Sequence, residues 1–235
     1  VWLFQSDDVS RDHLKTFREV LDVEELEKAD RFHIEDDRDT YICAHALIRC
    51  LLSAHGGGTP RIWRFRNTEY GKPEINARSS TPRLRFNLSH THGLVACAAT
   101  PEHDLGIDVE HEQRNDFSDL ADRFFAPAEA AFLRTVEREL WHESFYSIWT
   151  LKEAWIKAVG QGLSIPLDSF SFYLSPPRIM FSDTSAGTPD DWGFRLSWPT
   201  TQHALSLAVR HNRKSRMRYS YVELTPEQLA SLCVI

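Results

Sequence analysis

The sequence predicts an α+β fold made of two similar lobes, each with a small, mainly antiparallel sheet packed on one long helix. Both halves of the chain follow the same order of parts: short helices, a long helix, a break containing glycine and proline, and three strands. A local similarity supports a duplication, because the alike segments at residues 85–89 and 194–197 each lead into an apolar strand. The 235 residues, 42% of them hydrophobic, are enough for two small domains. We therefore expect an N-terminal lobe over residues 1–103 and a C-terminal lobe over residues 104–235.

The first half of the chain is expected to place its helices before most of its strands. Residues 1–9 predict a short strand and residues 10–28 two helical pieces, the second with Asp22 as its N-cap. A long helix is expected over residues 34–54, because apolar residues recur there at spacings of three and four. The glycines and proline that follow stop this helix. Three β-like runs come next, at residues 61–66, 84–88 and 94–99.

The second half repeats this order after an opening strand at residues 105–110. Two shorter helices and one long helix are then expected, over residues 117–124, 127–138 and 142–159. Pro127 suits the first turn of its helix, and Gly162 and Pro166 break the long one. The remaining strands are expected at residues 169–174, 193–198 and 204–209, with a polar loop at 182–191.

Charge and composition exclude several classes of protein. A net charge of −7 argues against a nucleic-acid binder. No apolar run approaches the roughly 18–20 residues that span a bilayer, and no secretory signal is present, so a cytoplasmic protein is expected. The histidines lack zinc-protease spacing, and the cysteines lack zinc or disulfide spacing and predict buried thiols in a reducing compartment. The basic run at 213–218 is more typical of a solvated loop than of a docking patch for an acidic protein.

The stretch from residue 149 to residue 160 is the element around which the predicted site is arranged. One stripe of this helix is apolar, and its members are Ile148, Leu151, Trp155 and Val159. Glu153 and Lys157 lie one turn apart on the opposite stripe, and Gly160 stands where a left-handed C-cap would end the helix. A solvent-exposed pair, contributing roughly 0.2–0.5 kcal/mol, is the simpler interpretation. A catalytic pair is the alternative, and it requires acidic and anion-binding groups elsewhere.

The strand at residues 105–110 supplies a second acidic group. Apolar and other residues alternate along it, so Asp108 and Glu110 share one face, with Cα atoms roughly 7 Å apart. A strand end that runs into solvent would explain this pattern. Two like charges that need a counter-charge also suit a hard cation such as Mg²⁺, with Glu153 as a third oxygen ligand.

The segment Phe-Asn-Leu-Ser-His at residues 86–90 provides groups that can bind an anion. A strand that ends there would expose Ser89 and His90 at a turn, where they could simply cap backbone groups. Hydroxyl, imidazolium and backbone N–H groups also donate to phosphate oxygens. Lys72, in a Gly-Lys-Pro turn, could add a positive charge to such a site.

Together these segments resemble the motif set of the Sfp-type 4′-phosphopantetheinyl transferases. The matching segments, in the order and spacing of that family, are Asn-Thr-Glu-Tyr-Gly-Lys-Pro at 67–73, Phe-Asn-Leu-Ser-His at 86–90, Gly-Ile-Asp-Val-Glu at 106–110 and Trp-Thr-Leu-Lys-Glu-Ala-Trp-Ile-Lys at 149–157. Residues 28–49 also resemble the N-terminal lobe of the family, so the similarity extends over nearly the whole chain.

The resemblance implies an enzyme that transfers the phosphopantetheine arm of coenzyme A to a serine of an apo acyl or peptidyl carrier protein, releasing adenosine 3′,5′-bisphosphate. It also implies a pseudo-two-fold pair of lobes with coenzyme A and Mg²⁺, or Mn²⁺ in its place, in the cleft between them. Because one chain carries both lobes, we expect a monomer. The carrier protein is left open among those of fatty-acid, polyketide, peptide-synthetase and lysine pathways.

The resemblance further assigns roles by position. The implied metal ligands are Asp108, Glu110 and Glu153. The implied coenzyme A contacts are Lys28, Thr68, Lys72, Ser89, His90, Asp108 and Lys157. Glu25 stands where a relative has a second lysine, which puts that contact in doubt.

A mechanism consistent with these roles uses Glu153 as the general base for the attacking serine and Lys157 as a cation beside the diphosphate. A coenzyme A or carrier-protein binding module without catalysis is the alternative function. Such a module does not need the full acidic set together with Lys157.

Overall fold

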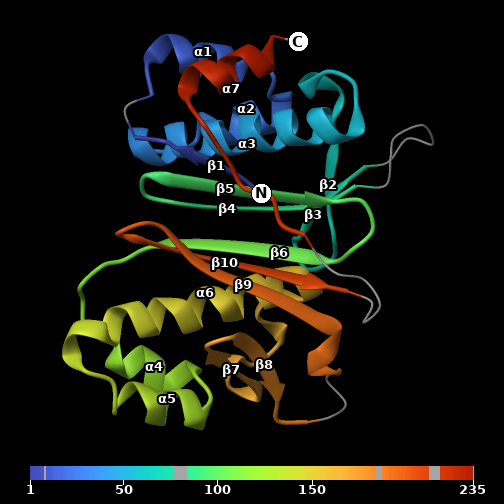
Figure 1. The fold of residues 1–235 in the computed structure, drawn as a ribbon. Helices are drawn as coiled ribbons and strands as arrows, with labels where there is room; N and C mark the ends of the chain where they lie inside the picture. Colours follow the sequence, from blue (N-terminus) through green and yellow to red (C-terminus); the bar gives the residue numbers. More distant parts are fainter. Residues whose placement is uncertain (8, 77–83, 184–186, 212–217, 235) are drawn as a thin grey trace. The chain divides into compact units, whose positions relative to one another are not determined.

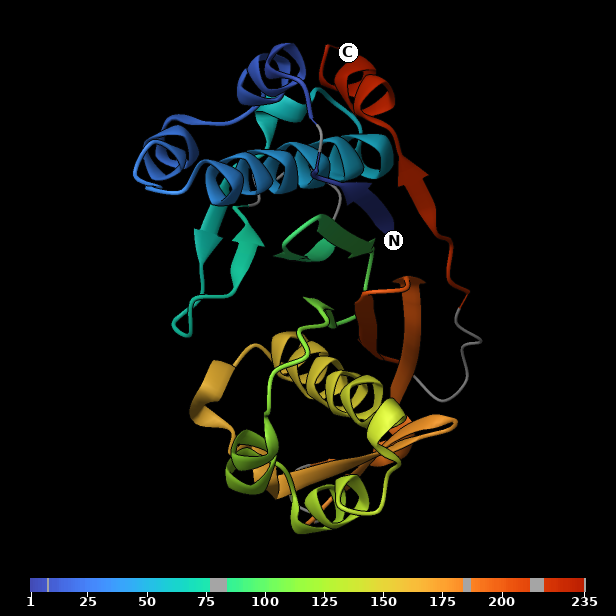
Figure 2. The ribbon, with the colours of Figure 1, turned by 90° about the vertical axis from the view of Figure 1, so that its left-hand side faces the viewer.

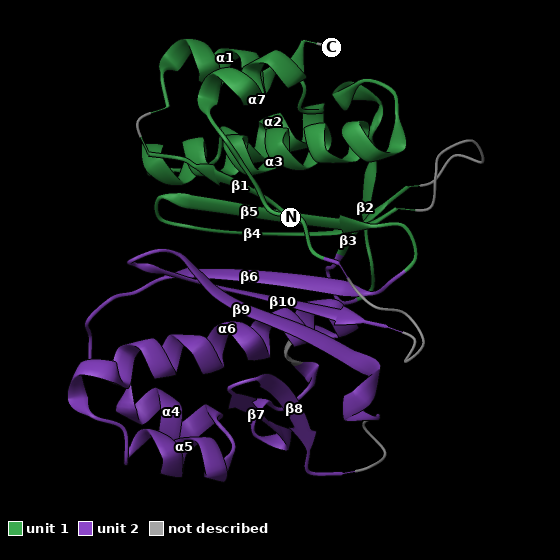
Figure 3. Ribbon diagram, viewed as in Figure 1, with its two compact units in different colours: residues 1–69, 73–102, 219–235 green, residues 70–72, 103–218 purple. Residues whose placement is uncertain are grey.

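The computed structural model describes residues 1–7, 9–76, 84–183, 187–211 and 218–234. Its chain divides into two compact units, unit 1 with residues 1–69, 73–102 and 219–235, and unit 2 with residues 70–72 and 103–218 (Figure 3). Each unit pairs one long helix with a small sheet, which confirms the predicted α+β fold. The last segment, expected in the C-terminal lobe, belongs to unit 1.

Unit 1 is built around helix α3, which packs on a four-stranded sheet (Figure 1). The strand order is β11-β1-β5-β4, and neighbouring strands are antiparallel except for β1 and β11, which are parallel. Strands β2 and β3 form a separate hairpin. The elements of unit 1 are β1 (Trp2–Gln5), α1 (Arg11–Arg18), α2 (Val23–Ala29), α3 (Glu35–Gly56), η1 (Pro60–Ile62), β2 (Phe65–Asn67), β3 (Pro73–Ile75), β4 (Arg85–Thr91), β5 (Leu94–Thr100), β11 (Val222–Leu224) and α7 (Pro226–Cys233).

A buried arginine joins three segments of unit 1. Arg49 of α3 is fully buried, and its guanidinium donates to the carboxylates of Asp22 at 2.8 Å and Glu25 at 2.9 Å. It also donates to the carbonyl oxygens of Pro60 at 3.2 Å and Trp63 at 3.0 Å. Because these acceptors lie at the start of α2 and in the chain after α3, one guanidinium fixes how both pack on α3.

Unit 2 has three layers with α6 in the middle (Figure 2). The antiparallel sheet β6-β10-β9 lies on one side of α6, and α5 and the hairpin of β7 and β8 contact its other side. The elements of unit 2 are β6 (Leu105–His111), α4 (Ser118–Phe124), α5 (Pro127–Leu133), η2 (Arg138–Leu140), α6 (Trp141–Val159), η3 (Gly162–Ser164), η4 (Leu167–Ser169), β7 (Phe170–Leu174), β8 (Pro177–Phe181), η6 (Pro189–Asp191), β9 (Trp192–Thr200) and β10 (His203–Arg210).

Several local expectations differ from the structure. The strand expected at 61–66 is wrong, because a short 3-10 helix with Pro60 in its first turn occupies its start and β2 begins at Phe65. The helix expected over 127–138 ends at Leu133. Strands β3, β8 and β11 and helix α7 were not expected, since runs of three to eight residues carry little periodic signal. Residues 213–217 of the basic run lie outside the described residues.

Two observations bear on the compositional expectations. None of the described helices has both the length and the apolar character that a membrane span requires. The four cysteines are free and buried, as predicted. Two of them, Cys50 of α3 and Cys233 of α7, have their sulfur atoms 3.6 Å apart without a bond.

Candidate active site

Helix α6 has the apolar stripe and the end that the sequence predicts. Leu151 is fully buried and Trp155 is 3% exposed, with its ring against those of Phe170 and Trp192. Gly160 ends the helix in the left-handed region at φ +80°, and its N–H donates to the carbonyl of Ile156. The residues of α6 that could do chemistry therefore sit on a rigid, well-packed element.

The polar face of α6 packs against strands β6 and β10 of unit 2. Lys157 Nζ lies 2.6 Å from Asp108 Oδ1 of β6, and the Asp108 side chain is 4% exposed. The fully buried Thr150 has its Oγ1 2.8 Å from Ser206 Oγ of β10. Glu153 is half-buried, and the Lys157 side chain is 29% exposed and pairs with Asp108 of β6, so the interpretation of Glu153 and Lys157 as a pair on an open surface is wrong.

Strand β6 meets the backbone of α6 at Gly106. A Cβ atom built on this residue would overlap the carbonyl oxygen of Ala154 and the backbone nitrogen of Ala158. Only glycine allows the strand and the helix to approach this closely. Asp108, two residues farther along the same strand face, is thereby brought within reach of Lys157.

Gly106→Ala should destabilise unit 2, because the added methyl group meets backbone atoms that cannot rotate away. We expect a loss of about 1–3 kcal/mol in the free energy of unfolding, the usual cost of overpacking. Urea denaturation followed by tryptophan fluorescence would measure it. A midpoint and slope equal to those of the parent would show that the contact between β6 and α6 tolerates a side chain.

Three carboxyl groups influence one another on this face. Burial raises the pKa of Glu110 to about 7, and the charges of Asp108 and Glu153 act in the same direction. Lys157 and a hydrogen bond with the Trp149 side chain oppose the rise. Burial is also the main cause that raises the pKa of Glu153, and the charge of Asp108 adds to the rise. The structure therefore brings these residues from β6 and α6 into one electrostatic cluster.

The donor atoms of this cluster are those that a hard divalent cation prefers. Mg²⁺ is usually held by one or two carboxylates together with waters and phosphate oxygens. In the described part of the chain, no three Asp, Glu, His or Cys side chains form a ready-made metal site. The binding of a cation by Asp108, Glu110 and Glu153 therefore stays a prediction, although carboxylate oxygens are the donors that such a cation prefers.

Lys72 belongs to unit 2 and lies at the C-terminal end of α6. Its Nζ donates to the carbonyl oxygens of Ala158 at 3.0 Å and Leu105 at 3.2 Å. Its side chain also passes Gly160, where an added Cβ would come 3.0 Å from Lys72 Cδ. A positive charge is therefore fixed at the negative end of the helix that carries Glu153.

The other predicted coenzyme A contacts lie in unit 1. Ser89 and His90 are inside strand β4, where they pair with Ala96 and Val95 of β5, so the expectation that the strand ends there and exposes both at a turn is wrong. Ser89 is buried and His90 is exposed, and a role of either in binding an anion stays a prediction. The strand continues to residue 91 because the turn is made farther on, by His92 and Gly93.

Two further predicted coenzyme A contacts, Lys28 and Thr68, lie outside strand β4. Lys28, in the last turn of α2, has its Nζ 5.2 Å from the centre of the Tyr41 ring. Thr68 directly follows β2. A role of either residue in binding stays a prediction.

Glu25, which stands where a relative has a lysine, has a structural role inside unit 1. It is 7% exposed and accepts from the backbone N–H of Asp22 at 2.9 Å, closing a capping box at the start of α2. Glu25 Oε1 lies 2.7 Å from His45 Nδ1, and Arg49 donates at 2.9 Å to Oε2, the oxygen that also accepts from Asp22. The carboxylate is committed to the interior of unit 1.

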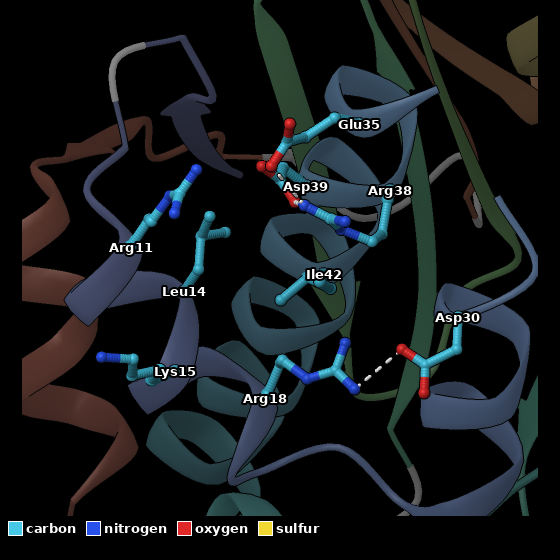
Figure 4. A pocket seen from close by; sticks show the side chains of 9 residues that line it. All are labelled: Arg11, Leu14, Lys15, Arg18, Asp30, Glu35, Arg38, Asp39 and Ile42. Carbon is cyan, nitrogen blue, oxygen red and sulfur yellow. Dashed lines mark hydrogen bonds and ion pairs between the residues drawn. The ribbon is translucent and has the colours of Figure 1, made fainter. Parts of the chain in front are cut away.

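A cavity of about 350 Å³ opens on unit 1 between α1 and α3 (Figure 4). Its lining alternates charges, and Arg18 is joined to Asp30 at 2.9 Å while Arg38 is joined to Glu35 at 2.9 Å. Two apolar side chains, Leu14 and Ile42, lie among these charged groups, Leu14 beside Arg11 and Lys15 and Ile42 between Arg18 and Arg38 (Figure 4). None of the sequence-predicted site residues lines this cavity.

Some residues that support the cluster from neighbouring positions were not predicted. Gly106 was seen only as part of a motif, although a glycine inside an alternating strand signals close backbone approach. Trp149 was seen only as a motif residue, although it stands one turn before Glu153. Lys152 and Glu129 form a buried ion pair of 2.7 Å that no local pattern indicates, because 23 positions separate them.

Two family models match the chain along most of its length. The model described as "4′-phosphopantetheinyl transferase superfamily" matches residues 104–208. The model described as "4′-phosphopantetheinyl transferase, N-terminal" matches residues 8–102. The two matches divide the chain close to the boundary between the first long segment of unit 1 and unit 2.

Individual proteins of this kind are similar to the chain over most of their own length. The 4′-phosphopantetheinyl transferase HetI of Nostoc sp. is 32% identical over 170 residues, which are 72% of this chain and 71% of HetI. The 4′-phosphopantetheinyl transferase Sfp of Bacillus subtilis is 33% identical over 166 residues, 71% of this chain and 72% of Sfp. The human L-aminoadipate-semialdehyde dehydrogenase-phosphopantetheinyl transferase is 28% identical over 211 residues, 82% of this chain and 68% of its own.

Proposed function

The chain belongs to the 4′-phosphopantetheinyl transferase superfamily and is an enzyme of phosphopantetheinyl transfer, and we propose that its donor is coenzyme A and its acceptor a serine hydroxyl of an apo acyl or peptidyl carrier protein. The second product is then adenosine 3′,5′-bisphosphate. The bond that forms joins the serine oxygen to the β-phosphorus, and the bond that breaks joins this phosphorus to the bridging diphosphate oxygen.

The observation that supports this chemistry best is the ion pair of 2.6 Å between Lys157 and Asp108, with Glu153 one turn away on the same helix. A cation beside a cluster of carboxylates is what a diphosphate and its counter-ion need together. Neither a structural helix nor a plain binding surface requires this combination. The full set therefore favours catalysis over a binding module.

Glu153 is the proposed general base. Burial and the charge of Asp108 raise the pKa of its carboxyl group above the ordinary value of 4.5, which makes the carboxylate a better proton acceptor near neutral pH. It would take the proton of the attacking serine as the new bond to phosphorus forms. Lys157, one turn farther on, would face the charge that grows on the departing diphosphate.

Mg²⁺, with Mn²⁺ as a substitute, is the proposed metal, and when bound it would neutralise the charge of the diphosphate. Asp108, Glu110 and Glu153 are the residues proposed to hold it. Lys28, Thr68, Lys72, Ser89 and His90 are kept as proposed coenzyme A contacts. A monomer that acts in the cytoplasm, without nucleic acid or membrane, completes the proposal.

Mass spectrometry of a carrier protein tests this function directly. The protein is incubated with coenzyme A, Mg²⁺ and a panel of apo carriers from fatty-acid, polyketide, peptide-synthetase and lysine pathways. We expect at least one carrier to gain the mass of one phosphopantetheine group, and its Ser→Ala variant to gain none. Binding of coenzyme A or of a carrier without any mass gain across the panel would contradict the proposal.

Asp108→Asn should weaken activity and its dependence on Mg²⁺ together. The amide keeps the size of the side chain but removes the charge, so we expect transfer to fall roughly 10²-fold and the Mg²⁺ concentration at half-maximal rate to rise. Calorimetry of coenzyme A binding with and without Mg²⁺ gives a readout that does not depend on turnover.

The matched control for this experiment is Asp190→Asn. Asp190 is an exposed partner of Arg178 at 3.2 Å, so its replacement should leave both measurements at the parental value. A Mg²⁺ profile of the Asp108 variant equal to that of the parent would remove this residue from the metal site.

A further inference from the structure

A buried ion pair holds α6 on the side opposite to the contact of Thr150 with β10. The Lys152 side chain is 1% exposed, and its Nζ lies 2.7 Å from Glu129 Oε2 of α5. It also donates to the carbonyl oxygens of Leu167 at 2.8 Å and Phe170 at 2.6 Å. Three acceptors at these distances match the three N–H donors of a protonated ammonium group.

The carboxylate of this pair is anchored as firmly as the ammonium. Glu129 Oε1 accepts from the backbone N–H of Phe172 at 2.8 Å, and Oε2 accepts from that of Ala126 at 3.0 Å. The ring of Phe170 lies over the ammonium at 4.3 Å. The pair therefore connects α6 with the start of α5, with the turn at Leu167 and with strand β7. We call these contacts the rear anchor, meaning Lys152, Glu129 and the backbone groups that they bind.

The position of Lys152 on the helix determines what the rear anchor can control. At 100° per residue, Lys152 lies about 200° from Thr150 and about 100° from Glu153 around the axis of α6. Thr150 contacts Ser206 of β10 on the front, and Lys157 contacts Asp108 of β6 there. The helix is thus held from front and rear, and a rotation about its axis would move Glu153 sideways.

The front and rear contacts differ in what happens to them during the proposed reaction. In the proposed reaction the ammonium of Lys157 also faces the diphosphate, so the substrate competes with Asp108 for this front contact. The rear anchor is buried and touches no group of the site. It can therefore keep α6 in register even if the contact between Lys157 and Asp108 changes.

We propose that the rear anchor is a positioning device that fixes the rotation of α6, and with it the places of Glu153 and Lys157, independently of the front ion pair. Lys152 and Glu129 touch neither the substrate nor the reacting atoms and act only through the helix. The expected effect on kcat rests on the proposed function. The claim that the rear anchor fixes the rotation of α6 does not.

Two variants separate positioning from simple folding. Glu129→Asp keeps both charges and shortens the anchor by one carbon–carbon bond. The double variant Lys152→Met with Glu129→Met removes both charges, so that no unpaired charge is left in the interior. Lys15→Met is the matched control, because Lys15 pairs with Asp12 at 2.8 Å on the surface of unit 1, with its side chain 75% exposed.

We expect both rear-anchor variants to lower kcat for carrier modification by roughly 10²-fold, the cost of misplacing a catalytic group by about 1 Å. KM for coenzyme A should stay near the parental value, because the binding groups remain. The control should keep the parental kcat. A variant that merely loosened the fold would change the free energy of unfolding and leave the folded fraction fully active.

A spectroscopic readout makes the test independent of activity. Protein labelled with 5-fluorotryptophan gives a ¹⁹F signal for Trp149, identified by its loss in Trp149→Phe, and this indole is hydrogen-bonded to Glu110. We expect the Trp149 signal to shift in the rear-anchor variants and not in Lys15→Met. Should the parent transfer no phosphopantetheine, the proposed function fails, while this signal still decides the inference.

The inference is overturned by a folded rear-anchor variant that has parental kcat, or by an unchanged Trp149 signal in Glu129→Asp. If the double variant does not fold, Glu129→Asp decides the question through both readouts. If Glu129→Asp does not fold, the double variant decides it in the same way.

Discussion

Glu153→Gln should lower the rate of phosphopantetheinyl transfer by about 10²- to 10⁴-fold, the contribution expected of a positioned general base. Glutamine keeps the length of the side chain and a hydrogen-bonding oxygen, but it cannot accept the serine proton near neutral pH. The surroundings of Glu153 suit a proton acceptor, because burial and the charge of Asp108 raise the pKa of its carboxyl group, while Lys157 opposes the rise. The loss should appear in kcat.

The measurement is single-turnover conversion of an apo carrier, with calorimetry of coenzyme A binding beside it. Coenzyme A should still bind, because Glu153 is not one of its proposed contacts. Glu143→Gln is the matched control, since Glu143 is an exposed residue in the first turn of the same helix. A Glu153 variant that transfers at a near-parental rate would exclude this residue as the base.

Arg49→Met should lower the free energy of unfolding by about 3–5 kcal/mol, the cost of breaking a buried ion pair by removing one partner. Methionine fills much of the volume, but it leaves the carboxylates of Asp22 and Glu25 and the carbonyl oxygens of Pro60 and Trp63 without their donor. Such a loss is a large part of the roughly 5–15 kcal/mol that stabilises a typical domain.

Urea denaturation monitored by circular dichroism would measure this effect. Arg61→Met is the control, because Arg61 pairs with Glu19 at 3.1 Å on the surface, with both side chains more than 60% exposed. Exposed pairs contribute about 0–1 kcal/mol, so the control should change little. Equal losses in the two variants would show that Arg49 does not organise the interior of unit 1.

The long helices and the strands next to the cluster were predictable from sequence. Helix α6 begins one residue before the predicted start and ends at the predicted residue, because an apolar stripe runs to Val159 and a left-handed glycine follows. Strand β6 was predicted one residue short, because its alternation is strict up to Glu110. These elements combine length with a clear period, and that is the signal on which sequence analysis depends.

Short elements and long-range pairing were not predictable in this way. Strand β11 has three residues, and it is a strand because it pairs with β1, which lies some 220 positions earlier in the chain. The turn at Pro60 replaced an expected strand because arginines and aromatic residues resemble a β-like run until the proline is considered. Local composition cannot supply the partner that makes such a segment a strand.

The candidate site was predictable to the extent that its residues lie in recognisable motifs. Asp108, Glu110, Glu153 and Lys157 were identified from two segments, and the structure brings them together. The surroundings were not identified, because burial of the polar face of α6 depends on β10, and Ser206 carries no motif. A helix face with Thr, Glu and Lys looks exposed in sequence, although in the fold a sheet buries Thr150 and partly covers Glu153 and Lys157.

The parallel pair of β1 and β11 has a consequence for the biosynthesis of the protein. On the ribosome, residues 103–218 emerge before Val222 to Leu224, so unit 2 has all of its strands while unit 1 still lacks one side of its sheet. Until then the nascent chain presents β1 as an unprotected edge, the kind of surface on which polypeptides aggregate. The half of the enzyme that is translated first is therefore the half that matures last.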